Sequence, residues 1–237
     1  MEPFLEIRNL EKNFGGVRAL NGITLSVPER AVVAVIGPNG SGKTTFLNCI
    51  NGIYKPDGGR IIFRGKDITG KSPHVTARLG IGRTFQIPRV FPRVTVLENI
   101  VAAVLDSPEP DRTIRRRAME LLERVGMEGL SENLAEDLSG GQKKLLELLR
   151  LWIRDPKLVL LDEPFAGVHP ELKSLFFEQI KAMRDQQKTF ILVSHDMKSV
   201  YTLSDQIYVF DLGCIIARGN EEHIKENERV IEAYLGN

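Results

Sequence analysis

The chain has 237 residues, of which 42% are hydrophobic and 27% are charged, a composition that predicts a folded globular protein and argues against disorder. Its length suffices for one large α/β domain, or for a core domain that carries a smaller lobe. The formal net charge of +1 gives no overall field to attract nucleic acid or acidic lipid, which disfavours a bare nucleic-acid-binding protein.

Neither a secretion signal nor a membrane span is expected in this sequence. No basic-then-apolar leader opens the chain, and no apolar run approaches the roughly 18 residues of a membrane span. Neither of the two cysteines, Cys49 and Cys214, has metal-ligand spacing, so we expect mostly buried, free thiols in a reducing compartment. We therefore expect a cytoplasmic protein whose membrane contacts come only through partners.

The N-terminal part of the chain predicts a β-rich region with one helix. Apolar and polar residues alternate over 4–10 and again over 22–27, as in half-buried strands. Residues 31–36, AVVAVI, form a continuous apolar run, which is typical of a fully buried strand in a parallel sheet. A helix is expected over 43–51 and a further short strand over 60–64.

The middle of the chain predicts a lobe of helices. After the turn-rich segment DSPEPD at 106–111, apolar residues recur with helical spacing over 113–125, and a second helix is expected over 142–153. We assign residues 88–154 to a helical lobe inserted into the core. The first helix carries basic residues that we expect on a solvated face, with a docking surface as the alternative: Arg112, Arg115, Arg116 and Arg117.

The last third of the chain alternates between buried strands and helices. Strands and helices are expected in turn over 158–161, 171–185, 190–194, 196–203 and 206–211. Such alternation implies a parallel sheet with helices packed on it. The sequence therefore predicts an α/β core that comprises residues 1–87 and 155–237.

A phosphate-binding pattern lies between the buried run AVVAVI and the first predicted helix. Residues 37–44, GPNGSGKT, fit G-x-x-x-x-G-K-[ST]. Glycines let backbone N–H groups close around phosphate oxygens, and the helix turns its positive end toward the anion. Lys43 is expected to place its charge on the β- and γ-phosphates, and the Thr44 hydroxyl to bind Mg²⁺. The alternative is a glycine turn with an exposed lysine.

Two carboxylates follow the buried run LVLL, at the predicted carboxyl end of a central strand, where ligands bind in open α/β sheets. Asp162 is expected to hold Mg²⁺ directly or through a water, and Glu163 to face the attacking water. His195 closes the strand FILVS, which we expect beside the phosphate loop, so it is expected to contact the γ-phosphate. The alternatives are a turn cap for the acidic pair and a structural role for the histidine.

A second anion-binding pattern, LSGGQ, occupies residues 138–142 and precedes the predicted helix KKLLELLRLWIR. Ser139 and two glycines at a helix start form a phosphate-shaped cap. One ATP does not need two such caps. The pattern is therefore either only a helix start, or it serves a nucleotide held by another copy of the chain.

These elements, in this order, resemble the ATP-binding cassette (ABC) ATPases over the whole chain. GPNGSGKTT resembles the Walker A motif, LSGGQ the signature motif, and LVLLDEP the Walker B motif with its catalytic glutamate. Gln86 in GRTFQ resembles the Q-loop glutamine, and His195 resembles the switch histidine. Phe14 in KNFGG resembles the aromatic residue that stacks on adenine, with core packing as the alternative.

The resemblance implies the ABC ATPase fold: a P-loop NTPase core with a mostly parallel sheet, an N-terminal antiparallel β subdomain and an inserted α-helical lobe. It implies ATP and Mg²⁺ as cofactors. The implied catalytic residues are Glu163, His195 and Gln86, and the implied metal ligands are Thr44, Gln86 and Asp162. The residues expected to contact nucleotide are Phe14, Gly37, Asn39, Gly40, Ser41, Gly42, Lys43, Thr44, Thr45, Ser139, Gly140, Gly141 and Gln142.

In this family two cassettes dimerise head to tail, so the resemblance implies a second ATPase subunit, identical or different, whose LSGGQ closes on the ATP. It also implies permease partners in the membrane, no nucleic acid, and a peripheral place on the inner face of the cell membrane. GIGRTFQIPRVFPRVTVLENI, DEPFAGVHP and the tail VIEAYLGN resemble the ATP-binding subunits of branched-chain amino-acid importers. DEPFAGV also resembles the lipopolysaccharide-export ATPase, although GRTFQ fits that group poorly.

The leading function is therefore ATP hydrolysis that powers import of branched-chain or similar amino acids. A soluble ABC ATPase for iron–sulfur assembly or nucleic-acid work is the alternative, although this chain has one cassette, no sustained heptads and no basic arm. The apolar, proline-broken segment after Gln86 is expected to line a groove for a helix of the membrane subunit, with packing under the helical lobe as the alternative.

Two features of the sequence depart from the family pattern. His169 stands where many cassettes carry the D-loop aspartate, so coupling across the dimer is expected to use different contacts. The region after Ile100 is shorter than in many importer subunits, which weakens the assignment to one substrate.

Overall fold

The computed structural model describes residues 3–235, which form two compact units. The core unit comprises residues up to 83, 157–163 and 186 onward, and the helical unit comprises 84–156 and 164–185. The helical unit thus takes in residues 164–185 in addition to the lobe that the sequence placed at 88–154. None of the helices within the described residues combines the length and apolar character needed to span a bilayer.

An antiparallel sheet of four strands, in the order β2-β1-β4-β5, forms one layer of the core unit. Its strands are β1 Leu5–Phe14, β2 Val17–Val27, β4 Gly58–Phe63 and β5 Lys66–Asp67. The alternating pattern buries one face, including Leu5 and Ile7, which confirms the expected antiparallel subdomain. β1 and β2 extend beyond the predicted strands because their mostly exposed outer halves pair across a turn at Gly15, whose φ is 57°.

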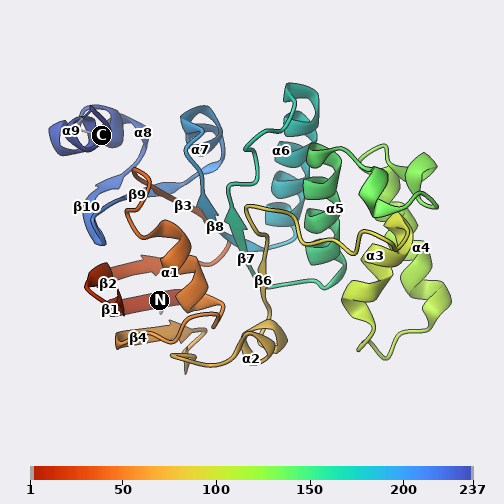
Figure 1. Cartoon of the computed structure of the whole chain (residues 1–237), viewed down its shortest axis with the longest axis horizontal. Coiled ribbons are helices and arrows are strands. Elements are labelled where there is room, and N and C mark those ends of the chain that lie inside the picture. The colour runs from red at the N-terminus through yellow and green to blue at the C-terminus, as the bar shows by residue number, and fades with distance from the viewer. Residues whose placement is uncertain (1–2, 236–237) are drawn as a thin grey trace. The chain divides into compact units, whose positions relative to one another are not determined.

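The second sheet of the core unit has six strands in the order β10-β9-β3-β8-β7-β6. They are β3 Val32–Ile36, β6 Ile81–Arg83, β7 Leu158–Asp162, β8 Thr189–Val193, β9 Gln206–Asp211 and β10 Cys214–Gly219. All pairs are parallel except β9 with β10. β3 lies between β9 and β8 (Figure 1), so every one of its residues is buried, as its continuous apolar run predicts.

The helices of the core unit cover these sheets. They are α1 Lys43–Ile50, α2 Pro73–Arg78, α7 Met197–Leu203, α8 Glu221–Lys225 and α9 Glu228–Leu235. Phe46 of α1 packs edge-on against Phe210 of β9, with ring centroids 5.4 Å apart. Val230 of α9 packs in a second apolar cluster with Ile36 of β3. The last helix is therefore anchored to the strand that leads into the phosphate loop.

The helical unit is built on one long buried helix. Its helices are α3 Val96–Val101, α4 Asp111–Glu123, α5 Gly140–Ile153 and α6 Pro170–Asp185, with 3₁₀ turns at Ala102–Val104, Glu128–Leu130 and Ala135–Asp137. Most residues of α5 are buried, among them Leu145, Leu148 and Trp152. Two regular helices appear where the periodic pattern predicted them: α4 lies two residues earlier at both ends, and α5 begins two residues earlier and ends at Ile153 as predicted.

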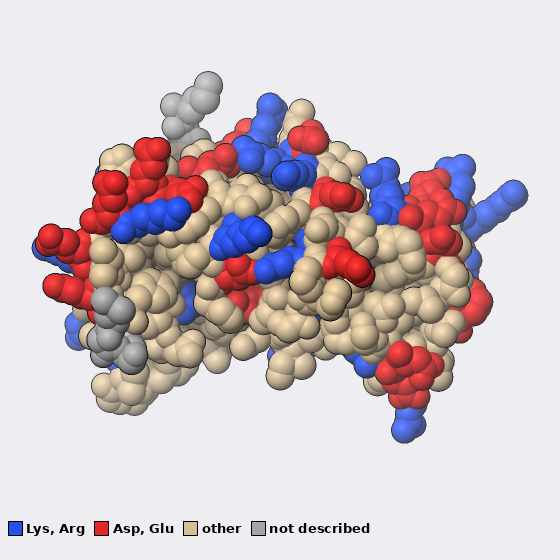
Figure 2. All heavy atoms as spheres, turned by 90° about the horizontal axis from the view of Figure 1, so that it is seen from above, with Lys and Arg blue, Asp and Glu red and all other residues tan. Residues whose placement is uncertain are grey.

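Arg112, Arg115 and Arg116 of α4 are exposed, as expected, whereas Arg117 is half-buried and its Nη2 donates to the Ile153 carbonyl oxygen at 3.0 Å. Arg115 pairs with Asp111 and Arg116 with Glu120, and these side chains are 44% to 73% exposed. On the face shown in Figure 2, acidic and basic side chains are interspersed, in keeping with a net charge of +1.

Candidate active site

The phosphate loop contains glycines that no other residue could replace without strain. Gly37 follows β3 with a φ of 145°, and a Cβ there would lie 2.0 Å from the Phe210 carbonyl oxygen. Gly42, the N-cap of α1, has a φ of 102°, and its Cβ would lie 2.4 Å from the Ala19 carbonyl oxygen. The backbone conformation and the close approach of β9 and β2 both require glycine at these positions.

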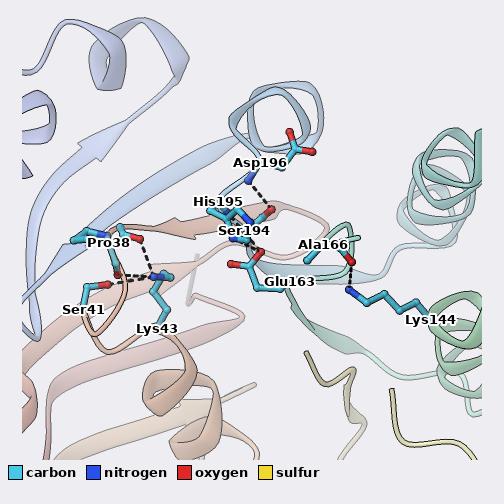
Figure 3. A network of polar contacts seen from close by, with 10 residues as sticks. Pro38, Ser41, Lys43, Lys144, Glu163, Ala166, Ser194, His195 and Asp196 are labelled. Atoms are coloured by element: carbon cyan, nitrogen blue, oxygen red, sulfur yellow. Dashed lines mark hydrogen bonds and ion pairs between the residues drawn. The ribbon is translucent and has the colours of Figure 1, made fainter. Parts of the chain in front are cut away.

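Lys43, the first residue of α1, bonds through its ammonium group to the backbone of the phosphate loop. Its Nζ donates hydrogen bonds to the carbonyl oxygens of Gly37, at 2.7 Å, and Pro38, at 2.8 Å (Figure 3). Burial lowers the pKa of Lys43, while the negative charges of Glu163 and Asp162 oppose that fall. The ammonium group is therefore oriented by the loop and lies in the field of two carboxylates.

The other expected contacts of the loop lie on its outer turn and on the first turn of α1. Asn39, Gly40 and Thr44 are exposed, Thr45 is half-buried, and Ser41 is buried. The first N–H groups of a helix have no partners within the helix, and the helix dipole is positive at that end. The structure thus brings the predicted loop residues together around a helix start that suits a phosphate.

Asp162 ends β7 and is 2% exposed. Its Oδ2 accepts a hydrogen bond at 2.8 Å from Nη2 of Arg83, the last residue of β6, and both side chains are at least 95% buried. A buried carboxylate of this kind needs a compensating charge, which the guanidinium supplies. The predicted metal ligand is therefore already part of a buried ion pair.

Glu163 follows in a conformation that is uncommon for a non-glycine residue, with a φ of 49°. Its N–H donates to the Val193 carbonyl oxygen at 2.9 Å, which fixes this turn against β8. Its Oε2 lies 2.9 Å from Nδ1 of His195 and also accepts from the His195 backbone N–H at 3.3 Å (Figure 3). The predicted base and the predicted switch histidine are therefore in direct contact.

The LSGGQ segment forms the start of α5 in the helical unit. The Ser139 hydroxyl accepts from the Gln142 N–H at 3.3 Å, and Gln142 Oε1 accepts from the Ser139 N–H at 2.9 Å, a complete capping box. Ser139 and Gly140 are exposed, whereas Gly141 is buried, with a Cβ position 2.8 Å from Leu172. LSGGQ thus forms a helix start, and Ser139 and Gly140 are exposed there within the single chain.

The loop between Glu163 and α6 is tied to the same helix. Lys144 of α5 is buried and donates from Nζ to the Ala166 carbonyl oxygen at 2.7 Å. Further along this loop His169 is exposed, with its Nδ1 3.9 Å from an oxygen of Glu171. The histidine that replaces the usual aspartate therefore points a polar side chain into solvent within this chain.

Gln86 is exposed and lies in the helical unit, in a segment without regular secondary structure. The buried carboxylate of Glu147 holds this segment by accepting from the N–H groups of Phe85, at 3.2 Å, and Arg89, at 3.1 Å. Burial raises the pKa of Glu147, although these two backbone hydrogen bonds oppose the rise. The backbone on both sides of Gln86 is therefore fixed by one side chain of α5.

Phe14 ends β1 and is 42% exposed, so it is not a core residue. Its ring packs edge-on against Tyr54 with centroids 5.1 Å apart, and Lys12 Nζ lies 5.3 Å from the ring centroid. Neither contact covers the ring completely. An exposed aromatic face at the end of a strand of the core unit is suited to stacking on a base.

Two residues that contact predicted site residues could not be identified from the sequence alone, Arg83 beside Asp162 and Tyr234 beside Gly37. Arg83, described above, has no local signal because its partner is distant in sequence. Tyr234 of α9 hydrogen-bonds with the backbone of Gly37; burial raises the pKa of Tyr234 to about 12, and that hydrogen bond opposes the rise. The tail VIEAYLGN gave a family resemblance but no indication that it reaches the loop.

The predicted site residues divide between the two units. The phosphate loop, Asp162, Glu163, His195 and Phe14 belong to the core unit, and Gln86 and the LSGGQ segment belong to the helical unit. Within the core unit the structure joins a glycine loop, a lysine and two carboxylates by contact or charge. This combination can bind a polyphosphate and offers an acceptor for the proton of a water.

Comparison with known proteins identifies similar chains along the whole length. Residues 20–166 match the family described as ABC transporter. The chain is 42% identical to the probable branched-chain amino acid transport ATP-binding protein LivG of Archaeoglobus fulgidus, over 98% of this chain and 95% of that protein. It is 40% identical to the high-affinity branched-chain amino acid transport ATP-binding protein BraF of Pseudomonas aeruginosa, over 99% and 98%. A solved ATP-binding cassette of an ABC transporter in its ADP conformation is 35% identical, with a TM-score of 0.89 over 100% of both chains.

Proposed function

This chain belongs to the ABC transporter family, and on that premise we propose that it is the ATP-hydrolysing subunit of an importer for branched-chain or similar amino acids. The similarity to LivG and BraF over nearly the whole of each chain carries the proposal, because both are described as branched-chain amino acid transport proteins. The comparisons lend no support to the soluble or lipopolysaccharide-export alternatives.

Within the ATPase cycle, each predicted site residue of the core unit has a proposed role. Lys43 and the loop N–H groups hold the β- and γ-phosphates, and Phe14 stacks on the adenine. Glu163 accepts the proton of the attacking water, and His195, held through Nδ1 by that carboxylate, contacts the γ-phosphate. The contact between Glu163 and His195 supports this division of roles, since it couples the base to the phosphate sensor.

Mg²⁺ is the proposed metal, and the residues present fit it. The Thr44 hydroxyl and the Asp162 carboxylate are hard oxygen donors of the kind that Mg²⁺ takes, and Gln86 is a proposed further ligand. Within residues 3–235 no group of three or more His, Cys, Asp or Glu side chains is placed to hold a metal. This suits an ion that proteins bind through one or two side chains together with substrate phosphates. When bound, Mg²⁺ neutralises phosphate charge.

The proposed working form is a dimer in which LSGGQ of each copy closes on the ATP of the other. The capping box leaves Ser139 and Gly140 exposed at a helix start, where a phosphate binds favourably. This role would explain why a chain with one phosphate loop has a second anion-binding cap. The second ATPase subunit is identical or different in this proposal.

The proposed permease contact is the segment after Gln86, which would hold the protein at the inner face of the membrane. Ile87 is 80% exposed and Phe91 is 49% exposed, so these side chains do not belong to the core. Besides Glu147, the buried Asn99 fixes the segment, because its side chain bonds the Phe91 N–H at 2.8 Å and the Phe91 carbonyl oxygen at 3.0 Å. A rigid backbone that presents apolar side chains is suited to docking a partner helix.

The experiment that tests this function is purification of the chain from membranes with identification of the bound proteins, followed by a transport assay. We expect an integral membrane protein, and ATP-dependent uptake of leucine, isoleucine or valine by vesicles that contain the complex. Phe91→Asp should abolish capture of the membrane protein without changing the thermal melt. Leu212→Asp, at a residue 80% exposed in the core unit, is the matched control. Capture of soluble assembly factors alone would contradict the importer assignment.

A further inference from the structure

One buried guanidinium joins three elements of the core unit. Arg83 of β6 stands opposite Leu160 of β7, so its side chain lies on the same face of the sheet as that of Asp162, two residues further on. Its Nη2 donates to Asp162 Oδ2 at 2.8 Å. Its Nη1 donates to Oδ1 of Asn48, on α1, at 2.6 Å. The two arms of the fork therefore connect β7 to α1.

Burying the charged side chain of Arg83 costs desolvation free energy. The side chains of Arg83 and Asp162 are only 5% and 3% exposed. Buried ion pairs contribute little net stability, and apolar residues of similar volume often replace them without loss. The position of Asp162 at the site suggests that the pair serves function, because a metal ligand must be charged and held in one orientation.

The two hydrogen bonds of the guanidinium relate two of the residues that we propose to hold Mg²⁺, Asp162 and Thr44. One arm contacts Asp162 itself. The other contacts Asn48, which lies four residues after Thr44 on α1 and hence on the same face of that helix. A planar guanidinium has fixed angles between its donors, so it fixes the separation of the groups that it bridges. Arg83 thus sets where β7 and the first turns of α1 stand relative to each other.

We infer that Arg83 is a positioning residue that fixes the spacing between Asp162 and Thr44 and thereby sets the affinity for the metal of Mg-ATP. This inference rests on the proposed Mg²⁺ site. Arg83 contacts the metal ligand and not the metal, in the manner of the outer hydrogen-bond partners of metal sites. Its loss should weaken metal binding while ATP binding without metal is retained, because its two guanidinium hydrogen bonds go to Asp162, a proposed metal ligand, and to Asn48 on α1.

The test measures Mn²⁺, a paramagnetic substitute for Mg²⁺, by electron paramagnetic resonance. The protein carries Glu163→Gln to stop turnover and is saturated with ATP. We expect Arg83→Met to raise the Kd for Mn²⁺ by about tenfold or more, while ATP affinity measured in EDTA is unchanged. Arg83→Lys keeps the charge but not the fork, so it should recover the thermal melt and only part of the Mn²⁺ affinity. Arg115→Met, in an exposed ion pair of α4, is the matched control and should change neither.

The outcomes separate the inference from the proposed function. Unchanged Mn²⁺ affinity in a folded Arg83→Met protein, or tighter binding, would overturn the positioning role. If Arg83→Met does not fold, Asn48→Ala removes only the α1 arm and should weaken Mn²⁺ binding by about threefold, and no change would overturn the inference. If Thr44→Val and Asp162→Asn leave Mn²⁺ affinity unaltered in the parent protein, the proposed metal site is wrong, and the inference fails with it.

Discussion

Two helices of this protein begin at glycine-containing segments, and they begin differently. α1 starts after GPNGSG with Gly42 as its N-cap, a residue in left-handed conformation that has no side chain to offer. α5 starts at Gly140 with Ser139 as its N-cap, and Ser139 and Gln142 satisfy each other's backbone N–H groups. The first helix start depends on a backbone conformation and close neighbours that only glycine accommodates, whereas the second is stabilised by an ordinary side-chain cap.

The difference indicates which of the two starts is built around a ligand. A left-handed glycine N-cap leaves the helix N–H groups to an external acceptor, here a proposed phosphate, with Lys43 alongside. A capping box is complete without a ligand, so α5 is stable in the single chain. This contrast fits a phosphate loop that binds ATP by itself and a signature segment that acts only when a second copy brings its nucleotide.

The comparison is tested most strongly by trapping the proposed dimer. Glu163→Gln keeps the side-chain shape but cannot accept a proton, so ATP turnover should fall by about a hundredfold or more. Bound ATP should then hold the dimer together, which gel filtration with and without Mg-ATP will detect. Glu171→Gln, at an exposed position, is the control. Near-normal turnover together with a monomer in ATP would show that neither the base nor the dimer is assigned correctly.

The next test places a charge at the α5 start in the trapped protein. Ser139→Arg should abolish ATP-driven dimerisation while the single chain binds ATP as before, because in the proposed dimer Ser139 serves the ATP of the other copy. Ser139→Asp keeps a capping side chain but repels phosphate. We expect it to abolish ATP-driven dimerisation as well, while the stability of the helix changes by only about 0.5 kcal/mol. Calorimetry and gel filtration separate the two effects. Loss of ATP binding by the monomer would mean that the cap acts on its own nucleotide.

A smaller effect is expected from the lysines next to the two helix starts. Lys43→Ala removes the charge aimed at the phosphates, and the Kd for ATP should rise by about tenfold or more. Lys143→Ala, whose Nζ donates to the Glu136 carbonyl oxygen near the α5 start, should leave that Kd unchanged. Titration calorimetry with ATP on both variants makes the comparison, and equal affinities for Lys43→Ala and the parent would remove the phosphate-loop assignment.

The smallest expected difference is in folding stability, between alanine substitutions at the glycines of the two helix starts. Gly42→Ala must place a Cβ 2.4 Å from a carbonyl oxygen at a φ of 102°, so we expect a loss of about 1–3 kcal/mol in unfolding free energy. Gly140→Ala has nothing within 4 Å of its Cβ and should change stability by no more than about 0.5 kcal/mol. Chemical denaturation measures both. Equal losses would show that the two starts are under similar strain.

Short-range sequence patterns were sufficient to predict structure and site wherever a functional motif directly adjoins a regular strand or helix. The run AVVAVI predicted a buried parallel strand, LVLL predicted β7, and GPNGSGKT between strand and helix located the phosphate loop, because each feature is written in contiguous residues. The contact between Glu163 and His195 could be anticipated only in outline, from two motifs that follow buried strands. Their adjacency depends on the pairing of β7 with β8.

Features that depend on long-range pairing left no such pattern. Arg83 ends a strand of three residues, too short for a periodic signal, and it meets Asp162 only because β6 pairs with β7. β10 was not expected, since it is half-buried along nearly its whole length and shows no alternation. The reach of Tyr234 to Gly37 likewise depends on how α9 packs on the sheet. Tertiary packing, which one sequence does not encode locally, decides all three.

The strand order has a consequence for how this protein is made. β3 and the GPNGSGKT segment leave the ribosome early, yet both neighbours of β3 are synthesised much later, as Thr189–Val193 and Gln206–Asp211. Gly37 also packs against Phe210 of the later strand. Pairing over such sequence distances is slow. Cellular ATP can therefore act as a stabilising ligand only for a nearly complete chain, and a nascent chain that stops before β9 has the phosphate-binding sequence without the binding site.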